Sequence, residues 1–99
     1  MGLIFAWDPQ KERLNIKKHA ITFSEASTVF NDAHGITIYD PDHSNSEDRF
    51  ILFGWSAANR LLLVVHVELS DTIRIISARE LTRTERTAYE KEIIRRQGL

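Results

Sequence analysis

The chain of 99 residues carries 13 Lys and Arg against 14 Asp and Glu, which gives a formal net charge of −1 at pH 7. The absence of cysteine excludes disulfide scaffolds and thiolate metal sites, and the length together with 42% hydrophobic residues predicts one compact domain over residues 1–99. Apolar runs such as 61–65 are far shorter than the ~20 residues of a membrane helix, and no signal peptide is recognisable. We therefore expect a cytoplasmic protein without a membrane partner.

The near-zero net charge hides an uneven distribution. Residues 1–50 hold 5 basic and 8 acidic side chains, whereas residues 51–99 hold 8 basic and 6 acidic ones. A basic excess over the whole chain is the usual sign of a nucleic-acid partner. In this chain such a surface can form only locally, and the C-terminal part favours it.

The N-terminal part predicts a strand followed by two helices. Residues 3–7 are apolar and aromatic, as in a short strand. Asp8 as N-cap and Pro9 at the first helical position predict a helix to about residue 18, with Leu14 as its main apolar anchor. A second helix is expected to begin after Ser24 as its N-cap.

The rest of the chain predicts four strands and a third helix. Turn residues separate the apolar segments 36–39, 49–55, 61–68 and 72–79. Their short connections indicate antiparallel hairpins, and 49–55 is expected to be central because it is apolar on both sides. Thr82 and Glu85 match a capping box that starts the last helix. The expected fold is α+β, an antiparallel sheet with three helices in the order β-α-α-β-β-β-β-α.

Lys18 and His19 lie together near the end of the first predicted helix. One interpretation is a phosphate-binding lysine beside an imidazole that titrates near neutral pH. The structural alternative is a helix C-terminus where cations offset the helix dipole.

Glu47 and Arg49 are two residues apart, so on a strand they share a face. They form either a surface ion pair at the entrance of a strand or a carboxylate that its arginine neighbour keeps ionised. In the second case Glu47 is available as a general base or as the group that orients one.

Arg74 and Arg79 belong to an otherwise apolar strand. Arginine is suited to bidentate phosphate contacts. The two residues have opposite parity, however, so an ideal strand puts them on opposite faces. They can hold one phosphate together only if the strand twists or ends before Arg79.

Two histidine-containing segments are expected to be structural. His66 lies among aliphatic residues of a strand, where a histidine is usually a satisfied core residue. The segment Asp-Pro-Asp-His at 40–43 matches no metal-loop spacing, so we expect a turn there and no metal site. The chain also has no glycine-rich phosphate loop, so any phosphate binding has to come from side chains.

Five segments and three later residues occur in an order that resembles a known family. The segments are FAWDP at 5–9, NIKKH at 15–19, FSEA at 23–26, EDRF at 47–50 and RIISAR at 74–79, and Glu85, Arg86 and Tyr89 follow them. Together they resemble the BrnT toxins of bacterial BrnT/BrnA toxin–antitoxin modules over nearly the whole chain. One departure is Ala20, where members of the family commonly have glycine.

The resemblance implies a compact α+β fold similar to that of RelE-type ribonuclease toxins. It implies cleavage of RNA without metal or cofactor, and inhibition of translation and growth. It further implies a BrnA-type antitoxin with a DNA-binding part, which neutralises the toxin in a hetero-oligomer that represses its own promoter.

The resemblance also implies roles for particular residues. Glu47 is expected to be the base, or the carboxylate that orients it, and Lys18 with Arg79 the phosphate clamp. His19 is a reserve acid–base group. The residues expected to bind substrate are Arg49, Arg74, Arg86 and Tyr89. Because the ribose 2′-hydroxyl is the expected nucleophile, DNA is not expected to be cut.

The alternative function is that of an interaction protein with the same fold, catalytically weak or silent, that serves as antitoxin partner or corepressor. The balanced charge favours it, since phosphate contacts supply much of the affinity for nucleic acid. The nearly complete set of polar residues favours the ribonuclease. The narrow apolar stripe of the last helix predicts a protein partner in either case.

Overall fold

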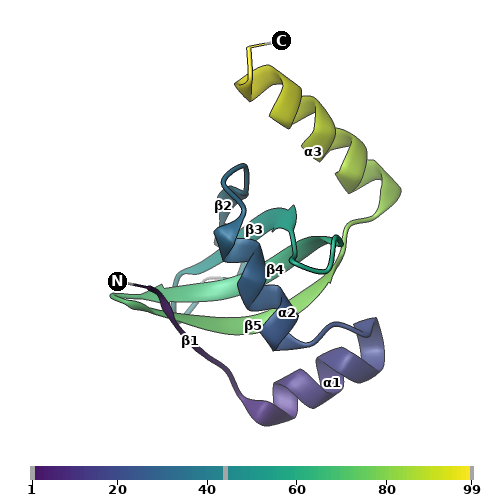
Figure 1. The fold of residues 1–99 in the computed structure, drawn as a ribbon. Helices are drawn as coiled ribbons and strands as arrows, with labels where there is room; N and C mark the ends of the chain where they lie inside the picture. The colour runs from purple at the N-terminus through teal and green to yellow at the C-terminus, as the bar shows by residue number, and fades with distance from the viewer. Residues whose placement is uncertain (1, 44, 99) are drawn as a thin grey trace.

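The computed structural model describes residues 2–43 and 45–98, which form one five-stranded sheet with three α-helices (Figure 1). The strands lie in the order β1-β5-β4-β3-β2. Their bounds are β1 Ile4–Ala6, β2 Ile36–Asp40, β3 Arg49–Trp55, β4 Leu61–Leu69 and β5 Thr72–Glu80. The α-helices are α1 Pro9–His19, α2 Phe23–Thr28 and α3 Arg83–Arg96, and two short 3-10 turns are η1 Val29–Asn31 and η2 Pro41–His43.

The sheet is mixed, which corrects the expectation of a purely antiparallel one. Strands β2 to β5 are antiparallel to their neighbours, as the short connections predict. Strand β1 instead pairs in parallel with β5, with Ile4 opposite Thr72 and Ala6 opposite Arg74. Because most of the chain separates these two strands, no turn signal could reveal their pairing. The middle strand is β4, and β3 lies between it and the edge strand β2, so the segment 49–55 is an inner strand as expected.

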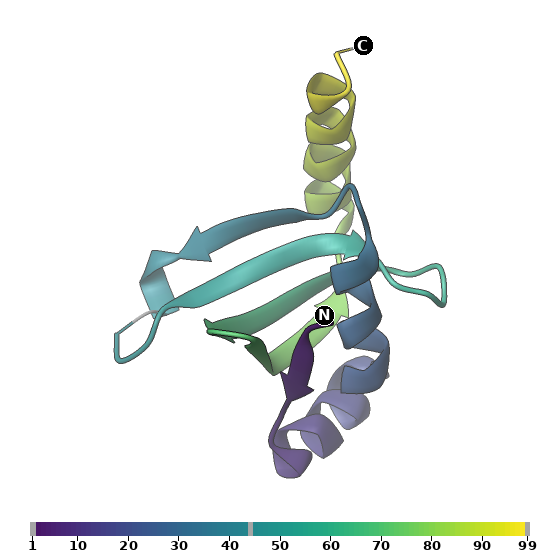
Figure 2. The same ribbon diagram turned by 60° about the vertical axis from the view of Figure 1, so that its left-hand side comes forward.

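The core lies between one face of the sheet and the segment formed by α2 and η1 (Figures 1 and 2). Phe23, Ala26 and Val29 from this segment are fully buried. They pack with residues of the inner strands, among them Leu62 and Val64. Helix α2 begins after Thr22, whose hydroxyl accepts a hydrogen bond from the Glu25 amide at 3.0 Å. The expected cap at Ser24 is therefore wrong.

Helix α1 begins as predicted, because the Asp8 carboxylate accepts from the Gln10 amide at 2.8 Å. It ends at His19, and Ala20 adopts a left-handed conformation with φ 58°. That conformation costs a residue with a Cβ about 1–2 kcal/mol, which glycine avoids. Ala20 nevertheless makes the C-cap bond, with its amide donating to the Ile16 carbonyl at 2.8 Å. The alanine at this position thus costs energy while the end of the helix keeps its geometry.

Helix α3 begins with the predicted capping box between Thr82 and Glu85, and it ends at Arg96. Tyr89 is 7% exposed and packs in a small cluster with Ile36 and Leu61. Beyond this contact the helix projects away from the sheet, as both ribbon views show (Figures 1 and 2). None of the described helices is long and apolar enough to cross a membrane.

Candidate functional site

A β-bulge in β5 places Arg74 and Arg79 on the same face of the sheet. Val65 of β4 pairs with Ser77, but the next residue, His66, pairs with Ile75, so β5 holds an extra residue at this point. The extra residue resets the alternation of side chains. Arg74 lies opposite Val67 and Arg79 opposite Leu63, and both arginines therefore point to one side. The opposite parity of the two residues in the sequence therefore does not put them on opposite faces of the sheet.

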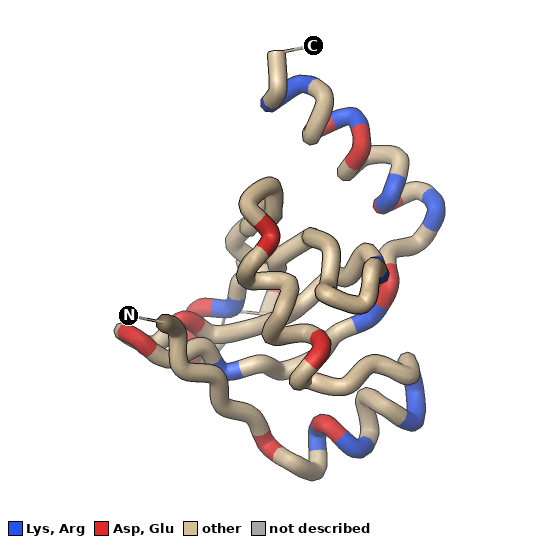
Figure 3. The backbone as a smooth tube through the Cα atoms, in the orientation of Figure 1, with Lys and Arg blue, Asp and Glu red and all other residues tan. Residues whose placement is uncertain are grey.

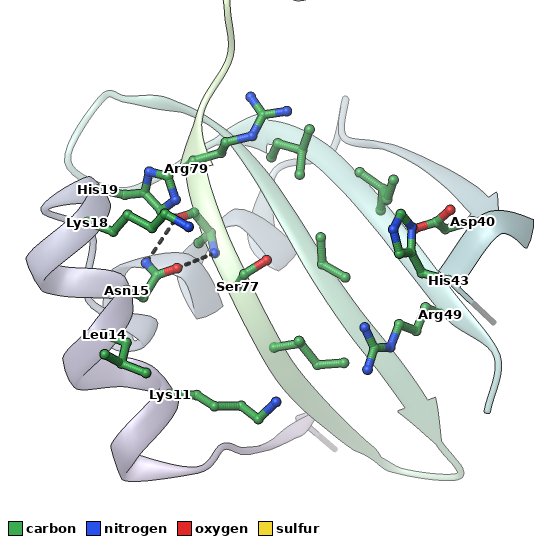
Figure 4. Close-up of a pocket in the computed structure, with 15 residues that line it drawn as sticks. Lys11, Leu14, Asn15, Lys18, His19, Asp40, His43, Arg49, Ser77 and Arg79 are labelled. Atoms are coloured by element: carbon green, nitrogen blue, oxygen red, sulfur yellow. Dashed lines mark hydrogen bonds and ion pairs between the residues drawn. The ribbon is translucent and has the colours of Figure 1, made fainter. Parts of the chain in front are cut away.

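A hollow of about 510 Å³ opens on that face (Figure 4). Its floor is aliphatic and includes Ile51, Leu63, Val65 and Ile76. Polar side chains surround the floor from two sides, as Figure 4 shows. On the side of α1 and β5 these are Lys11, Lys18, His19 and Arg79, and on the side of β2 and β3 they are Asp40, His43 and Arg49. The hollow is thus a mainly cationic rim around an apolar floor, although the chain as a whole is nearly neutral.

Asn15 holds α1 beside this hollow. Its side-chain amide donates to the Ala78 carbonyl at 2.9 Å and to the Ile21 carbonyl at 3.0 Å, and it accepts from the Ala78 amide at 3.0 Å. Strand β1 pairs with β5 no further than Arg74, so Asn15 takes the place of a strand at the next part of the edge. Sequence reasoning missed this residue and expected Leu14 to anchor the helix, but Leu14 is 64% exposed and Asn15 is 6% exposed.

The guanidinium of Arg79 is held at the rim by the first turn of α3. Its two terminal nitrogens donate to the Glu85 carboxylate at 2.8 and 2.9 Å, and one of them also donates to the Glu80 carbonyl at 3.2 Å. The hydrogen bonds from Arg79 lower the pKa of Glu85 to about 2, and those with Thr82 add to the effect. The same ion pair raises the pKa of Arg79. Arg79 is therefore a fixed cation whose direction depends on α3.

This ion pair predicts a loss of stability in acid. Because the pKa of Glu85 falls from 4.5 to about 2 on folding, the stabilisation is complete above pH 4.5 and is lost as the pH falls towards 2. Both side chains are about one-third exposed, so solvent screening reduces the contribution to about 1 kcal/mol. Urea unfolding of Glu85→Gln is expected to show a deficit of that size against the parent protein at pH 7 and a smaller one at pH 3. An equal deficit at both pH values would contradict the assignment.

Glu47 lies in a smaller neighbouring hollow of about 210 Å³, which shares Lys11, Arg49 and Ile76 with the larger one. Its carboxylate accepts a hydrogen bond from Arg74, and it lies 4.0 Å from the terminal nitrogen of Arg49. Glu47 therefore contacts two of the candidate substrate-binding arginines. It does not line the hollow that contains Lys18 and Arg79.

Arg86 and Tyr89 lie outside both hollows. The Arg86 guanidinium sits 5.2 Å from the centre of the Trp55 ring and also pairs with Glu90 at 3.3 Å. Burial raises the pKa of the Tyr89 hydroxyl. These contacts attach α3 to the sheet, so the structure separates this pair from the other six candidate residues.

The two histidine-containing segments that were expected to be structural lie in different parts of the molecule. His66 is fully buried on the core side, 4.8 Å from the Phe30 ring centre, with Nε2 3.0 Å from the Glu68 carboxylate. His43 lines the large hollow beside Asp40. Within residues 2–43 and 45–98, no group of three or more His, Asp and Glu side chains is arranged to hold a metal ion.

Basic residues are concentrated on α1, β5 and α3, as the tube in Figure 3 shows. The acidic residues of β2 and of the segment after it lie at the β2 edge of the sheet, next to β3. Helix α1 belongs to the acidic half of the chain, so the fold brings its basic residues to the side of the C-terminal ones. The hollow lies between the two regions.

Comparison with known proteins gives one family and one fold. The sequence-family model described as "Ribonuclease toxin, BrnT, of type II toxin-antitoxin system" matches residues 7–85. The 1.1 Å crystal structure of the Brucella abortus ribonuclease toxin BrnT is similar, with a TM-score of 0.58 and 20% sequence identity over 84% of this chain and 99% of that one. No curated protein matches the sequence. The expected likeness to RelE-type toxins stays a prediction.

Proposed function

The chain belongs to the BrnT family of ribonuclease toxins of type II toxin–antitoxin systems, and on that premise we propose that it cleaves RNA by attack of a ribose 2′-hydroxyl on the adjacent phosphate, without a metal ion. One observation carries the proposal. The bulge in β5 turns Arg74 and Arg79 to the face that also holds Arg49, Lys18 and His19. Fixed cations on one concave surface stabilise the negative charge that develops on phosphorus oxygens.

Lys18 and Arg79 are proposed to bind the scissile or a neighbouring phosphate. Both line the hollow, and Figure 4 shows them on the same side of it. Arg79 keeps a fixed direction through Glu85. His19, beside Lys18, lines the same hollow and is kept as a reserve acid–base group. The hollow thus supplies positive charge and titratable groups from the protein itself, which supports a reaction that needs no metal.

Glu47 is proposed to orient the arginines rather than to remove the proton. Its carboxylate is engaged by Arg74 and faces Arg49. A carboxylate that accepts from one guanidinium group and faces a second one is directed towards those arginines and not towards a substrate hydroxyl. Of the two roles expected from the sequence, these contacts favour the orienting one.

The test is cleavage of a single-stranded RNA oligonucleotide by the purified protein. We expect cleavage that EDTA does not abolish, products ending in a cyclic phosphate and a 5′-hydroxyl, and no cleavage of the same sequence as DNA or with a 2′-deoxy sugar at the scissile position. Because few cations line the hollow, the association constant for RNA should fall only modestly as salt is added. In a plot of its logarithm against the logarithm of the salt concentration, each phosphate neutralised contributes about −0.7 to the slope. Cleavage of DNA at a similar rate would contradict the mechanism.

An antitoxin partner is part of the proposal. Toxins of type II modules are neutralised by a protein, and we propose a BrnA-type antitoxin whose DNA-binding part represses the promoter, with growth arrest when the toxin acts alone in the cytoplasm. The surface that supports it is an apolar groove of about 210 Å³ between α3 and the sheet, lined by Ile36, Phe53, Ala88 and Tyr89 among others. Ile38 of the edge strand β2 and Ile94 of α3, the two elements that carry Ile36 and Tyr89, are about half exposed.

The second candidate function is that of a silent partner or corepressor. The same groove and the open edge of β2 favour it, since neither requires catalysis. Circular dichroism distinguishes the two candidates when combined with the cleavage assay. A folded protein that binds its antitoxin and leaves RNA intact would support the silent partner and contradict the ribonuclease.

A further inference from the structure

His43 and Asp40 form a pair on the side of the hollow opposite α1, and the mechanism above does not use it. Strand β2 ends at Asp40, and η2 then turns the chain back. This turn brings His43 Nδ1 to 3.0 Å from Asp40 Oδ2. The Asp40 side chain is 13% exposed and that of His43 is 69% exposed, so the carboxylate lies beneath an imidazole that substrate can reach. Figure 4 shows the pair next to Arg49.

The geometry determines which imidazole nitrogen can act. A carboxylate at Nδ1 favours the tautomer whose Nδ1–H donates to it, and this leaves the lone pair on Nε2. Within residues 2–43 and 45–98, His43 Nε2 has no hydrogen-bond partner. An imidazole oriented by a carboxylate and open on its other nitrogen is the arrangement of a general base.

Arg49 places a cation next to this imidazole. It lies directly opposite Asp40 in the β2–β3 register and lines the same hollow. A phosphate bound by Arg49 would therefore have its neighbouring ribose within reach of His43. The other charged groups of the hollow come from α1 and β5, and they are Lys11, Lys18, His19 and Arg79. Asp42 precedes His43 in η2.

We propose that His43, positioned by Asp40, is the general base of RNA cleavage and that Arg49 binds the phosphate it acts on, an inference that rests on the proposed ribonuclease function. His43 Nε2 takes the proton from the ribose 2′-hydroxyl, and the 2′-oxygen forms a bond to phosphorus. The bond from phosphorus to the 5′-oxygen breaks, and that oxygen takes a proton from water. The products are a 2′,3′-cyclic phosphate and a 5′-hydroxyl, and His43 later returns its proton to water.

His43 is better suited to this step than the other two acid–base candidates. Glu47 is engaged by Arg74. His19 follows Lys18 at the end of α1, where no carboxylate of the described residues lies within hydrogen-bond distance to fix its tautomer. His43 combines an orienting carboxylate, an exposed second nitrogen and a neighbouring guanidinium.

The experiment compares His43→Ala, His43→Gln and Asp40→Asn with the parent protein on a single-stranded RNA oligonucleotide. His34→Ala is the matched control, because His34 is an exposed histidine that does not line the hollow. Single-turnover cleavage rates and RNA dissociation constants are measured separately. We expect cleavage to fall about 100-fold or more in His43→Ala, with binding changed less than about 3-fold, since a general base contributes 10²–10⁴-fold. Asp40→Asn should lose about 10-fold or more, because the imidazole tautomer is no longer fixed.

Two readouts separate catalysis from a structural role. Free imidazole should restore part of the activity of His43→Ala, and it should leave Asp40→Asn and His34→Ala unchanged. The pH profile of the cleavage rate should differ between the parent protein and His43→Gln, because a glutamine side chain cannot take up the proton.

The outcomes also distinguish a failure of the His43 proposal from a failure of the ribonuclease function on which it rests. Cleavage by the parent protein with an equal rate for His43→Ala would overturn the role of His43 and leave the ribonuclease function intact. A loss of activity without imidazole rescue and with an unchanged pH profile in His43→Gln would likewise overturn it, in favour of a structural turn. A parent protein that is folded and cleaves no RNA would overturn the ribonuclease function itself.

Discussion

Replacing Asn15 by leucine is expected to lower the free energy of unfolding by about 3 kcal/mol. The leucine is of similar size but leaves the Ala78 amide, the Ala78 carbonyl and the Ile21 carbonyl without their partner. Each buried polar group left unpaired costs about 1–3 kcal/mol, and the better helix propensity of leucine offsets only a small part. Urea unfolding followed by circular dichroism measures the difference.

The control for this variant is Leu14→Ser on the same helix. Leu14 is 64% exposed, so we expect a change within about 0.5 kcal/mol. Asn15→Leu should also weaken RNA binding, because α1 carries Lys11 and Lys18 to the rim of the hollow. A stability equal to that of the parent would mean that water replaces the amide, and that Asn15 does not close the edge of β5.

Asn15 illustrates where prediction from the sequence ends. Local signals located most elements: Asp8 and Pro9 start α1, and the Thr82–Glu85 capping box starts α3. The side of α1 that faces the sheet was not predictable in the same way, because the helix is held by an amide and not by an apolar stripe. The apolar pattern therefore points to Leu14, the neighbour of the residue that is buried.

The bulge at Ile75–Ser77 is a second feature that the alternation of residues did not reveal. Even or odd spacing along a strand predicts which face a side chain takes, and a single extra residue reverses this for everything after it. No glycine or proline marks the position, and two consecutive isoleucines fit either register. The chemistry of the side chains is enough to select the candidate arginines as a set, whereas their common face follows only from the pairing with β4.

The Asp40–His43 pair shows a third limit. The segment matches no metal-loop spacing and predicts a turn, and it does form the turn η2. Its proximity to Arg49 arises from the β2–β3 register, which spacing along the chain does not show. A histidine three residues after an aspartate is a weak sign of a catalytic group in the sequence alone. It gains weight only when the structure places an arginine from the neighbouring strand beside it.

Replacing Arg79 by alanine is expected to lower the single-turnover rate of RNA cleavage by about 100-fold or more, since removal of one preorganised donor to a developing oxyanion costs 10²–10³-fold. Arg79→Lys should recover little of this loss, because an ammonium cannot reproduce the bidentate geometry of the guanidinium. A quenched-flow or gel assay with protein in excess over RNA measures the rate without the contribution of product release.

The difficulty with Arg79 is that it also binds Glu85, so its loss disturbs the start of α3 as well as the hollow. Glu85→Gln breaks the same ion pair and keeps the arginine, and it should lose far less activity than Arg79→Ala, under about 10-fold. Arg96→Ala removes an arginine that pairs with Glu92 at the far end of α3 and should cleave at the parental rate. If Glu85→Gln lost as much activity as Arg79→Ala, the arginine would act by holding α3, and the phosphate contact would have to be assigned to Arg49 or Lys18.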